Sequence, residues 1–201
     1  MTANKRVLIP IADGSEDIET VAIIDVLRRA QLDVTVASVM PDLQVKAARG
    51  TSIVADAMLE DCAQQHFDAI ALPGGIPGAN HLRDSSRLIQ MLQTQLTTGD
   101  FIAAICASPA VVFAHHGLSK GRKSTSHPGF VQFLEHAVNE RVVIDGNCIT
   151  SQGPGTAIEF ALAIVACLQN KTSALKVAEP MVLSSEILHW LSNIETRSIT
   201  Q

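Results

Sequence analysis

Aromatic residues are scarce in this sequence, and tyrosine is absent. The 201 residues include one Trp and six Phe, so aromatic side chains make up 3% of the chain. Surfaces that stack on nucleic-acid bases or sugar rings are built from such side chains. Positive charge is not in excess either, because 15 Lys and Arg stand against 20 Asp and Glu, a formal net charge of -5 at pH 7. We therefore expect no direct binding of nucleic acid.

Paired cysteines and long apolar runs are also lacking. Cys62, Cys106, Cys148 and Cys167 stand far apart and form no Cys-x-x-Cys motif, which argues against a zinc site and against a disulfide framework. No apolar stretch approaches the ~20 residues of a membrane span. The first residues lack the cleavage site of a secretory signal. These observations predict a cytoplasmic protein in a reducing compartment, with no metal and no membrane partner.

The sequence does contain enough apolar residues for one sizeable core. Hydrophobic residues make up 47% and charged residues 17% of the chain, a balance typical of folded globular proteins. No internal repeat, low-complexity tract or linker interrupts it. We therefore expect a single domain over residues 1–201.

Short apolar runs alternate with longer helical patterns along the chain, which is typical of βαβ units around a parallel sheet. Two hairpins are predicted, one over residues 44–54 beside the main sheet and one over 142–152, where VVIDGNCITSQ contains an Asp-Gly turn signal. Residues 171–201 look helical and then frayed. The predicted strands begin at residues 6, 33, 67 and 101, and the predicted helices cover 18–30, 84–98, 107–117 and 153–169.

Cys106 lies where a predicted strand ends and a predicted helix begins. Its sulfur should project from the carboxyl edge of the sheet, where open α/β sheets place their ligands. A helix N-terminus lowers the pKa of a thiol, and the small neighbours Ala104, Ala107 and Ser108 suit a sharp turn that exposes a nucleophile. The alternative is a buried cysteine that acts as a small hydrophobe. We assign that alternative to Cys62, Cys148 and Cys167, and chemistry to Cys106.

Two acids interrupt a first helix that is apolar almost all the way round and is therefore predicted to be covered on most sides. These acids are Glu19 and Asp25. Glu19 falls in the first turn, at the same edge of the sheet as Cys106. Burial and a nearby thiolate would both raise the pKa of Glu19, so that it could stay protonated and stabilise the thiolate. The alternative is that Glu19 only interacts favourably with the positive end of the helix dipole.

Three further residues follow predicted strands or stand in loops. Gly74 and Gly75 lie just beyond a strand end, where bare backbone can approach a ligand and aim N–H groups at an oxyanion. A tight strand-to-helix connection explains them equally well. His127 precedes a proline and should lie in a loop, as active-site histidines often do. A lone histidine is more often structural or solvated.

Taken together, these segments resemble the ThiJ/PfpI family, in the branch of the Parkinsonism-associated protein deglycase and bacterial YajL. The resemblance implies an α/β fold of flavodoxin-like type, a doubly wound parallel sheet with helices on both faces and a small β-hairpin, usually in a homodimer. It places the nucleophile on Cys106 and its protonated acid on Glu19, with a nearby histidine at His127. The segments that carry it are DGSEDIETVAIIDVLRRA, LPGGIPGA, AAICASPA, TSHP and SQGPGTAIEFALAIV.

The same resemblance assigns the oxyanion-stabilising groups to Gly74, Gly75 and the backbone of Ala107. Ser108 departs from the family, because close relatives often carry glycine or alanine there. No clear third acid follows His127, so a protease-type triad is not expected.

The resemblance implies a cofactor-independent enzyme that acts on methylglyoxal, glyoxal or their early adducts with proteins and nucleotides. A second hypothesis is a redox sensor or stress chaperone, because a low-pKa thiolate is readily oxidised. A third is thiazole monophosphate biosynthesis, which only the shared family name suggests.

Overall fold

A computed structural model of the chain describes residues 4–196. Its centre is a seven-stranded sheet in the order β10-β11-β7-β6-β1-β2-β5. All neighbouring strands are parallel except the edge pair β10 and β11. The strands are β1 (Arg6–Ile11), β2 (Asp33–Ser38), β5 (Ala57–Met58), β6 (Ala69–Leu72), β7 (Phe101–Ile105), β10 (Val142–Asp145) and β11 (Cys148–Ser151).

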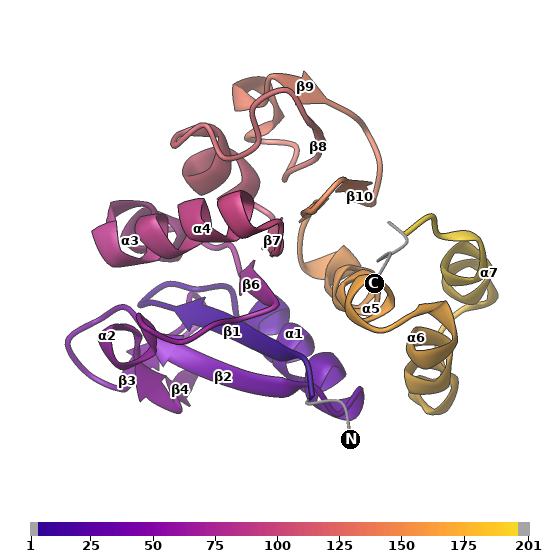
Figure 1. The fold of residues 1–201 in the computed structure, drawn as a ribbon, viewed down its shortest axis with the longest axis horizontal. Coiled ribbons are helices and arrows are strands. Elements are labelled where there is room, and N and C mark those ends of the chain that lie inside the picture. The colour runs from indigo at the N-terminus through magenta and orange to yellow at the C-terminus, as the bar shows by residue number, and fades with distance from the viewer. Residues whose placement is uncertain (1–3, 197–201) are drawn as a thin grey trace.

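Helices cover both faces of this sheet, because its central strands are apolar on both sides (Figure 1). Along β1, Val7 and Ile9 point into one hydrophobic cluster, and Leu8 points into the other. The predicted flavodoxin-like α/β fold is therefore confirmed. The first face is covered by α1 (Asp17–Arg29) and α5 (Ala157–Leu168), and α6 (Lys171–Ala178) and α7 (Ser185–Asn193) pack against α5. The second face is covered by α2 (Leu59–Cys62), α3 (Gly78–Asp84), α4 (Ser86–Thr98) and a π-helix at Pro109–Ala114.

Both predicted hairpins are present. Antiparallel β3 (Gln44–Lys46) and β4 (Ser52–Val54) form a small sheet separate from the main one. In the β10–β11 hairpin, Asp145 pairs with Cys148, so the turn residues are Gly146 and Asn147 rather than the Asp-Gly pair. Gly146 takes the positive φ of 62° that this turn needs. A third short pair joins β8 (Lys123–Ser124) to β9 (His136–Ala137).

Most predicted helices are present, and their ends follow local capping. The Ser85 side chain accepts from the N–H of Leu88 at the start of α4, and Gly99 ends that helix with a φ of 82°. The preceding helix α3 was not predicted. A 3-10 turn at Pro154–Thr156 leads into α5, and a further one at Glu179–Met181 follows α6. Fraying expected at the extreme C-terminus falls on residues 197–201, outside the described residues.

One expectation about α1 is wrong. The helix is not covered on most sides, because Ile18 is 59% exposed and Val21 is 51% exposed. Asp25 also faces solvent and forms an ion pair of 2.6 Å with Arg29, one helical turn later. Of the two acids, Glu19 fits the prediction of a buried carboxyl, with no exposed surface. Composition shows that a helix is apolar, but it does not show which side the sheet covers.

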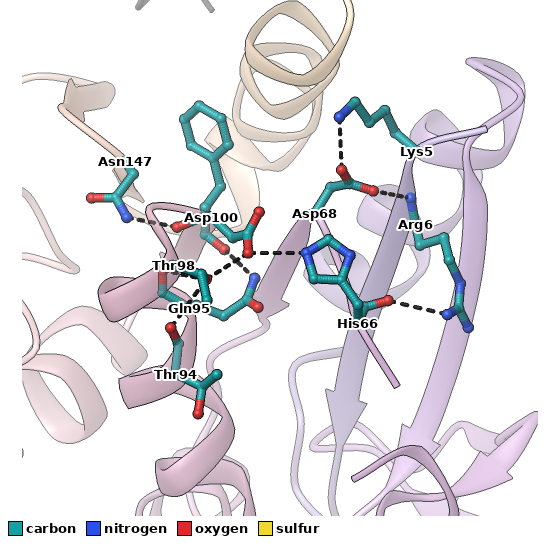
Figure 2. Close-up of polar contacts among 10 residues, drawn as sticks. Lys5, Arg6, His66, Asp68, Thr94, Gln95, Thr98, Asp100 and Asn147 are labelled. Atoms are coloured by element: carbon teal, nitrogen blue, oxygen red, sulfur yellow. Dashed lines mark hydrogen bonds and ion pairs between the residues drawn. The ribbon is translucent and has the colours of Figure 1, made fainter. Parts of the chain in front are cut away.

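A network of polar side chains joins the amino ends of neighbouring strands in the main sheet (Figure 2). Asp68, just before β6, accepts from Lys5 Nζ and from the N–H of Arg6, each at 2.7 Å. Asp100 lies just before β7, and its Oδ2 atom is 3.0 Å from Nε2 of His66. Asn147 donates to the carbonyl of Asp100 at 2.6 Å. The network therefore links residues at the starts of β1, β6 and β7.

Candidate active site

Cys106 lies directly after β7, at the sharp turn into the π-helix. Its backbone has a φ of 64°, a value that residues other than glycine rarely adopt. The turn is held because the N–H of Cys106 donates to the carbonyl of Ser151 at 3.0 Å. The cysteine is 9% exposed, whereas Cys62, Cys148 and Cys167 are 0–2% exposed. Strained backbone at the carboxyl edge of a parallel sheet is typical of a nucleophile elbow.

The Pro73-Gly74-Gly75 turn after β6 packs directly against this elbow. A Cβ atom on Gly74 would lie 2.6 Å from the Cβ of Cys106 and 2.8 Å from the carbonyl oxygen of Ile105, so only glycine fits. Gly75 has a φ of 87°, and a Cβ there would lie 2.4 Å from the carbonyl of Gly14. The two glycines let the turn contact both the elbow and the start of the first helix.

Glu19 reaches this turn from the first turn of α1. Its Oε2 atom accepts the N–H of Gly74 at 2.8 Å. Its Oε1 atom is buried and finds no hydrogen-bond partner within residues 4–196. The helix is started by Glu16, whose side chain caps the N–H of Glu19 at 2.8 Å. Glu19 is therefore more than a cap, since another acid performs that function.

Glu19 and Cys106 influence each other's ionisation. Burial raises the pKa of Glu19 to about 7, against the lowering effect of the Gly74 N–H and of the Cys106 side chain, and the charge of Glu16 adds to the rise. Burial, the charge of Glu19 and contact with it raise the pKa of the Cys106 thiol to about 12. With Glu19 ionised, the thiol is therefore neutral, which is the reverse of the expected protonation. A protonated Glu19 would no longer repel the thiolate, so the two groups compete for one proton.

Two backbone N–H groups favour charge on the sulfur. Hydrogen bonds from Gly75 and Ala107 lower the pKa of Cys106, against the effects of burial and Glu19. They are two of the three groups expected to stabilise an oxyanion. The third, the N–H of Gly74, is occupied by Glu19 instead. The structure thus brings all three residues to the site but divides their N–H groups between the sulfur and the acid.

His127 is tied to the elbow through its backbone. Its N–H donates to the carbonyl of Cys106 at 2.8 Å, while its ring is exposed. The Nδ1 atom accepts the N–H of Gly129 at 3.1 Å, so a neutral ring carries its proton on Nε2. The ring also packs edge-on against Phe130, with 6.2 Å between centroids. Within the described chain, no carboxylate is bonded to this ring.

Ser108 has a role that the sequence analysis missed. Its hydroxyl is fully buried and donates to the carbonyl of Pro73 at 2.6 Å. The elbow is thereby bonded to the turn that holds Gly74 and Gly75. The departure from glycine or alanine was visible in the sequence, but its partner lies 35 residues away.

The described residues include no group of three or more His, Cys, Asp or Glu side chains that could hold a metal ion. All four cysteines are free thiols. No helix over residues 4–196 is long and apolar enough to cross a membrane. The site is therefore built from a cysteine, an acid, backbone N–H groups and a neighbouring histidine.

The structure is thus an α/β protein with a doubly wound parallel sheet. It places a cysteine on a strained strand-to-helix turn and a buried glutamate beside that cysteine. The family model described as the DJ-1/PfpI family matches residues 5–167. The chain belongs to this family, as its resemblance to ThiJ/PfpI proteins predicted.

Relatives and solved structures agree with this assignment. "Protein DJ-1 homolog B" of Arabidopsis thaliana is 46% identical over 87% of this chain, and the match covers 40% of that protein, so the chain spans less than half of its length. "Glutathione-independent glyoxalase DJR-1.2" of Caenorhabditis elegans is 37% identical, with 92% of this chain and 100% of that protein covered. The structure of oxidized Toxoplasma gondii DJ-1 has a TM-score of 0.88 and 43% identity, covering 90% of this chain and 99% of that one.

Proposed function

We propose that this protein is a cofactor-independent enzyme of the glyoxalase or deglycase type that acts on methylglyoxal, glyoxal and their early adducts. The observation that carries the proposal is the Cys106 elbow, with a φ of 64° and with the buried Glu19 and the N–H groups of Gly75 and Ala107 around its sulfur. A nucleophile, a proton carrier and oxyanion donors are the groups that carbonyl addition requires. The name of the Caenorhabditis elegans relative supports a glyoxalase reaction.

The mechanism begins with a proton transfer from Cys106 to Glu19. The thiolate adds to the aldehyde carbon of methylglyoxal, and Glu19 gives that proton to the new oxyanion, which yields a hemithioacetal and leaves Glu19 ionised. Glu19 then carries the proton from the former aldehyde carbon to the ketone carbon through an enediol. The first carbon is thereby oxidised and the second reduced, so no external oxidant is needed. Water cleaves the resulting thioester, which releases lactate and regenerates the thiol.

The remaining groups position the reacting atoms. The N–H groups of Gly75 and Ala107 stabilise the oxyanion of each addition step. The exposed ring of His127, with its proton on Nε2, orients the adduct at the mouth of the site. Gly74 holds Glu19 in reach of the elbow through its N–H.

The test is lactate formation from methylglyoxal by purified protein in glutathione-free buffer. We expect Cys106→Ala to abolish turnover and Glu19→Ala to reduce it by at least ~100-fold, the lower range for acid–base catalysis. Cys62→Ala is the matched control, because Cys62 is buried away from the elbow, in α2. Equal rates in wild type and Cys106→Ala would rule out the mechanism.

Action on adducts requires a separate measurement, because removal of free methylglyoxal also makes reversible adducts dissociate. Preformed adducts of a cysteine or lysine peptide should be followed with a chemical trap that captures free dicarbonyl. True deglycation accelerates adduct loss above the rate with saturating trap alone. An unchanged rate would restrict the activity to free dicarbonyls.

A redox-sensing role is the second candidate, and the greater exposure of Cys106 than of the other three cysteines favours it. The thiolate would attack a peroxide oxygen, break the O–O bond and become a sulfenic acid while water or hydroxide leaves. Mass spectrometry after mild peroxide should find Cys106 oxidised well before Cys62, Cys148 and Cys167. Equal oxidation of all four would remove this candidate.

A homodimer also remains a proposal, and the exposed apolar residues of α1 support it. Ile18 and Val21 lie three positions apart on one helix face. Light scattering should report a dimer for wild type and a monomer for Ile18→Lys/Val21→Lys. Val182→Lys is the control, because Val182 is 92% exposed in a different part of the chain. A wild-type monomer would contradict the proposal.

A further inference from the structure

The peptide unit between Pro73 and Gly74 is hydrogen-bonded at both of its polar ends. Ser108 Oγ donates to the carbonyl oxygen of Pro73 at 2.6 Å, and the N–H of Gly74 donates to Glu19 Oε2 at 2.8 Å. The carbonyl and the N–H belong to one conjugated amide. A hydrogen bond to the carbonyl polarises this amide and strengthens the N–H as a donor, by roughly 10–30% per bond in such chains.

We propose that Ser108 is a positioning residue that moves the shared proton of Glu19 and Cys106 toward the sulfur, acting through the Pro73–Gly74 peptide. A stronger N–H stabilises the ionised carboxylate more than the neutral acid. An ionised Glu19 repels a thiolate, so the proton then rests on Cys106. Ser108 thus restrains the thiolate at neutral pH. The inference rests on the pair used in the proposed function, but it needs no substrate.

Few other groups act on this pair. Glu16, on the same helix end, raises the pKa of Glu19 through its charge and so opposes Ser108. The N–H groups of Gly75 and Ala107 act on the sulfur alone. His127 is bonded to the Cys106 residue through its backbone N–H. The Ser108 hydroxyl is fully buried and carries no charge, so it acts on Glu19 only through the hydrogen bonds of the Pro73–Gly74 peptide.

Loss of the Ser108 hydroxyl has opposite effects under a purely structural role and under the proposed one. If Ser108 only braced the turn, its loss would loosen the Gly75 N–H and make the thiolate harder to form. If it acts through the amide, its loss makes the thiolate easier to form. The experiment is the rate of Cys106 alkylation by iodoacetamide against pH, followed by mass spectrometry of the peptide that contains it.

In Ser108→Ala and Ser108→Gly, we expect the midpoint of Cys106 alkylation to fall by a few tenths of a pH unit, about a twofold rise in rate below the midpoint. Ser108→Thr keeps the hydroxyl and should restore the wild-type midpoint. Ser38→Ala is the matched control, since Ser38 is also buried and donates to a backbone carbonyl, that of Asp42, at 2.6 Å. It should leave the midpoint unchanged.

A double-mutant cycle completes the test. In a Glu19→Gln background there is no carboxylate to stabilise, so Ser108→Ala should no longer shift the midpoint. The inference is overturned if the midpoint rises or stays constant in Ser108→Ala, or if the shift persists in the Glu19→Gln background. Methylglyoxal turnover is not a readout here, so the result stands whether or not the proposed activity is found.

Discussion

The backbone N–H of His127 donates a hydrogen bond of 2.8 Å to the carbonyl oxygen of Cys106. This bond joins two segments that are far apart in the sequence, and it does not involve either side chain. The loop that carries the histidine is therefore fixed to the nucleophile elbow by its main chain. Changing the imidazole leaves this main-chain bond in place, although it removes the bond from the N–H of Gly129 to Nδ1.

His127→Ala should lower kcat/KM for methylglyoxal by about 10- to 100-fold, because the adduct loses an orienting group. The alkylation midpoint of Cys106 should stay near the wild-type value, since its N–H partners are those of Gly75 and Ala107. Steady-state kinetics and alkylation against pH measure the two effects. His136→Ala serves as the control, because its side chain is 54% exposed in β9. A clear rise of the Cys106 alkylation midpoint in His127→Ala would instead show that the ring stabilises the thiolate electrostatically.

Glu19→Gln should change how stability depends on pH. Burial raises the pKa of Glu19 in the folded state from 4.5 to about 7. The folded protein therefore binds this proton more tightly, and its stability falls as pH rises between these values. As the pH rises from about 4 to about 8, the free energy of unfolding of Glu19→Gln should therefore increase by about 3 kcal/mol relative to that of the wild type.

Urea unfolding at several pH values checks this prediction. Asp25→Asn is the control, because Asp25 is exposed and its ion pair with Arg29 should contribute less than about 1 kcal/mol at any pH. Parallel stability curves for Glu19→Gln and wild type would show that the acid titrates alike in the folded and unfolded chain.

Gly75→Ala should destabilise the protein more than Gly99→Ala. Both glycines have a positive φ, 87° and 82°, so an added Cβ strains the backbone to a similar extent. Only at Gly75 does that Cβ meet other atoms, the carbonyl of Gly14 at 2.4 Å among them, whereas nothing lies within 4 Å at Gly99. Chemical denaturation should give a loss of about 1–2 kcal/mol for Gly99→Ala and of about 3 kcal/mol or more for Gly75→Ala. Equal losses would mean that the turn can move away from α1.

Asp68→Asn should weaken the protein at neutral pH and have little effect in acid. Partial burial raises the pKa of Asp68, but hydrogen bonds from Lys5 and from the N–H of Arg6 outweigh it and lower the pKa below its usual value (Figure 2). This carboxylate stabilises the fold above the pKa of the unfolded chain, and its contribution is lost as pH falls through the folded pKa.

Denaturation at pH 7 should therefore show Asp68→Asn less stable by about 1 kcal/mol, and the difference should disappear once the pH falls below the lowered folded-state pKa of Asp68. Lys5→Ala is the comparison, because Lys5 is 44% exposed and should contribute less than the N–H of Arg6. A difference that persists at low pH would point to packing rather than charge.

The order of strands and helices could be predicted because each of these elements has a local pattern of apolar and turn-forming residues. Apolar runs and turn residues placed β1, β2, β6, β7 and both hairpins near their observed positions. The same patterns missed α3, whose seven residues are too few for a clear apolar repeat. They also misjudged α1, where Ile18 and Val21 face outward.

The candidate site was predicted in its members but not in its connections. Cys106 follows β7 and Glu19 follows β1, and only β6 lies between these two parallel strands, so the carboxyl edge of the sheet brings them together. No local pattern indicated that Gly74 binds the acid while Gly75 and Ala107 face the sulfur. Ser108 stood out as an unusual residue, but its hydrogen bond to Pro73 could not be foreseen.

The fold class, the family and the position of Cys106 at a strand-to-helix turn could all be read from the linear chain, because each depends on residue types at fixed spacing. Only the tertiary structure decided which N–H bonds to which atom, how deeply Glu19 is buried and which acid lies beside the thiol of Cys106. Those properties depend on distances of a few ångströms between segments far apart in the chain, and on the exclusion of water from between them, neither of which a linear pattern encodes.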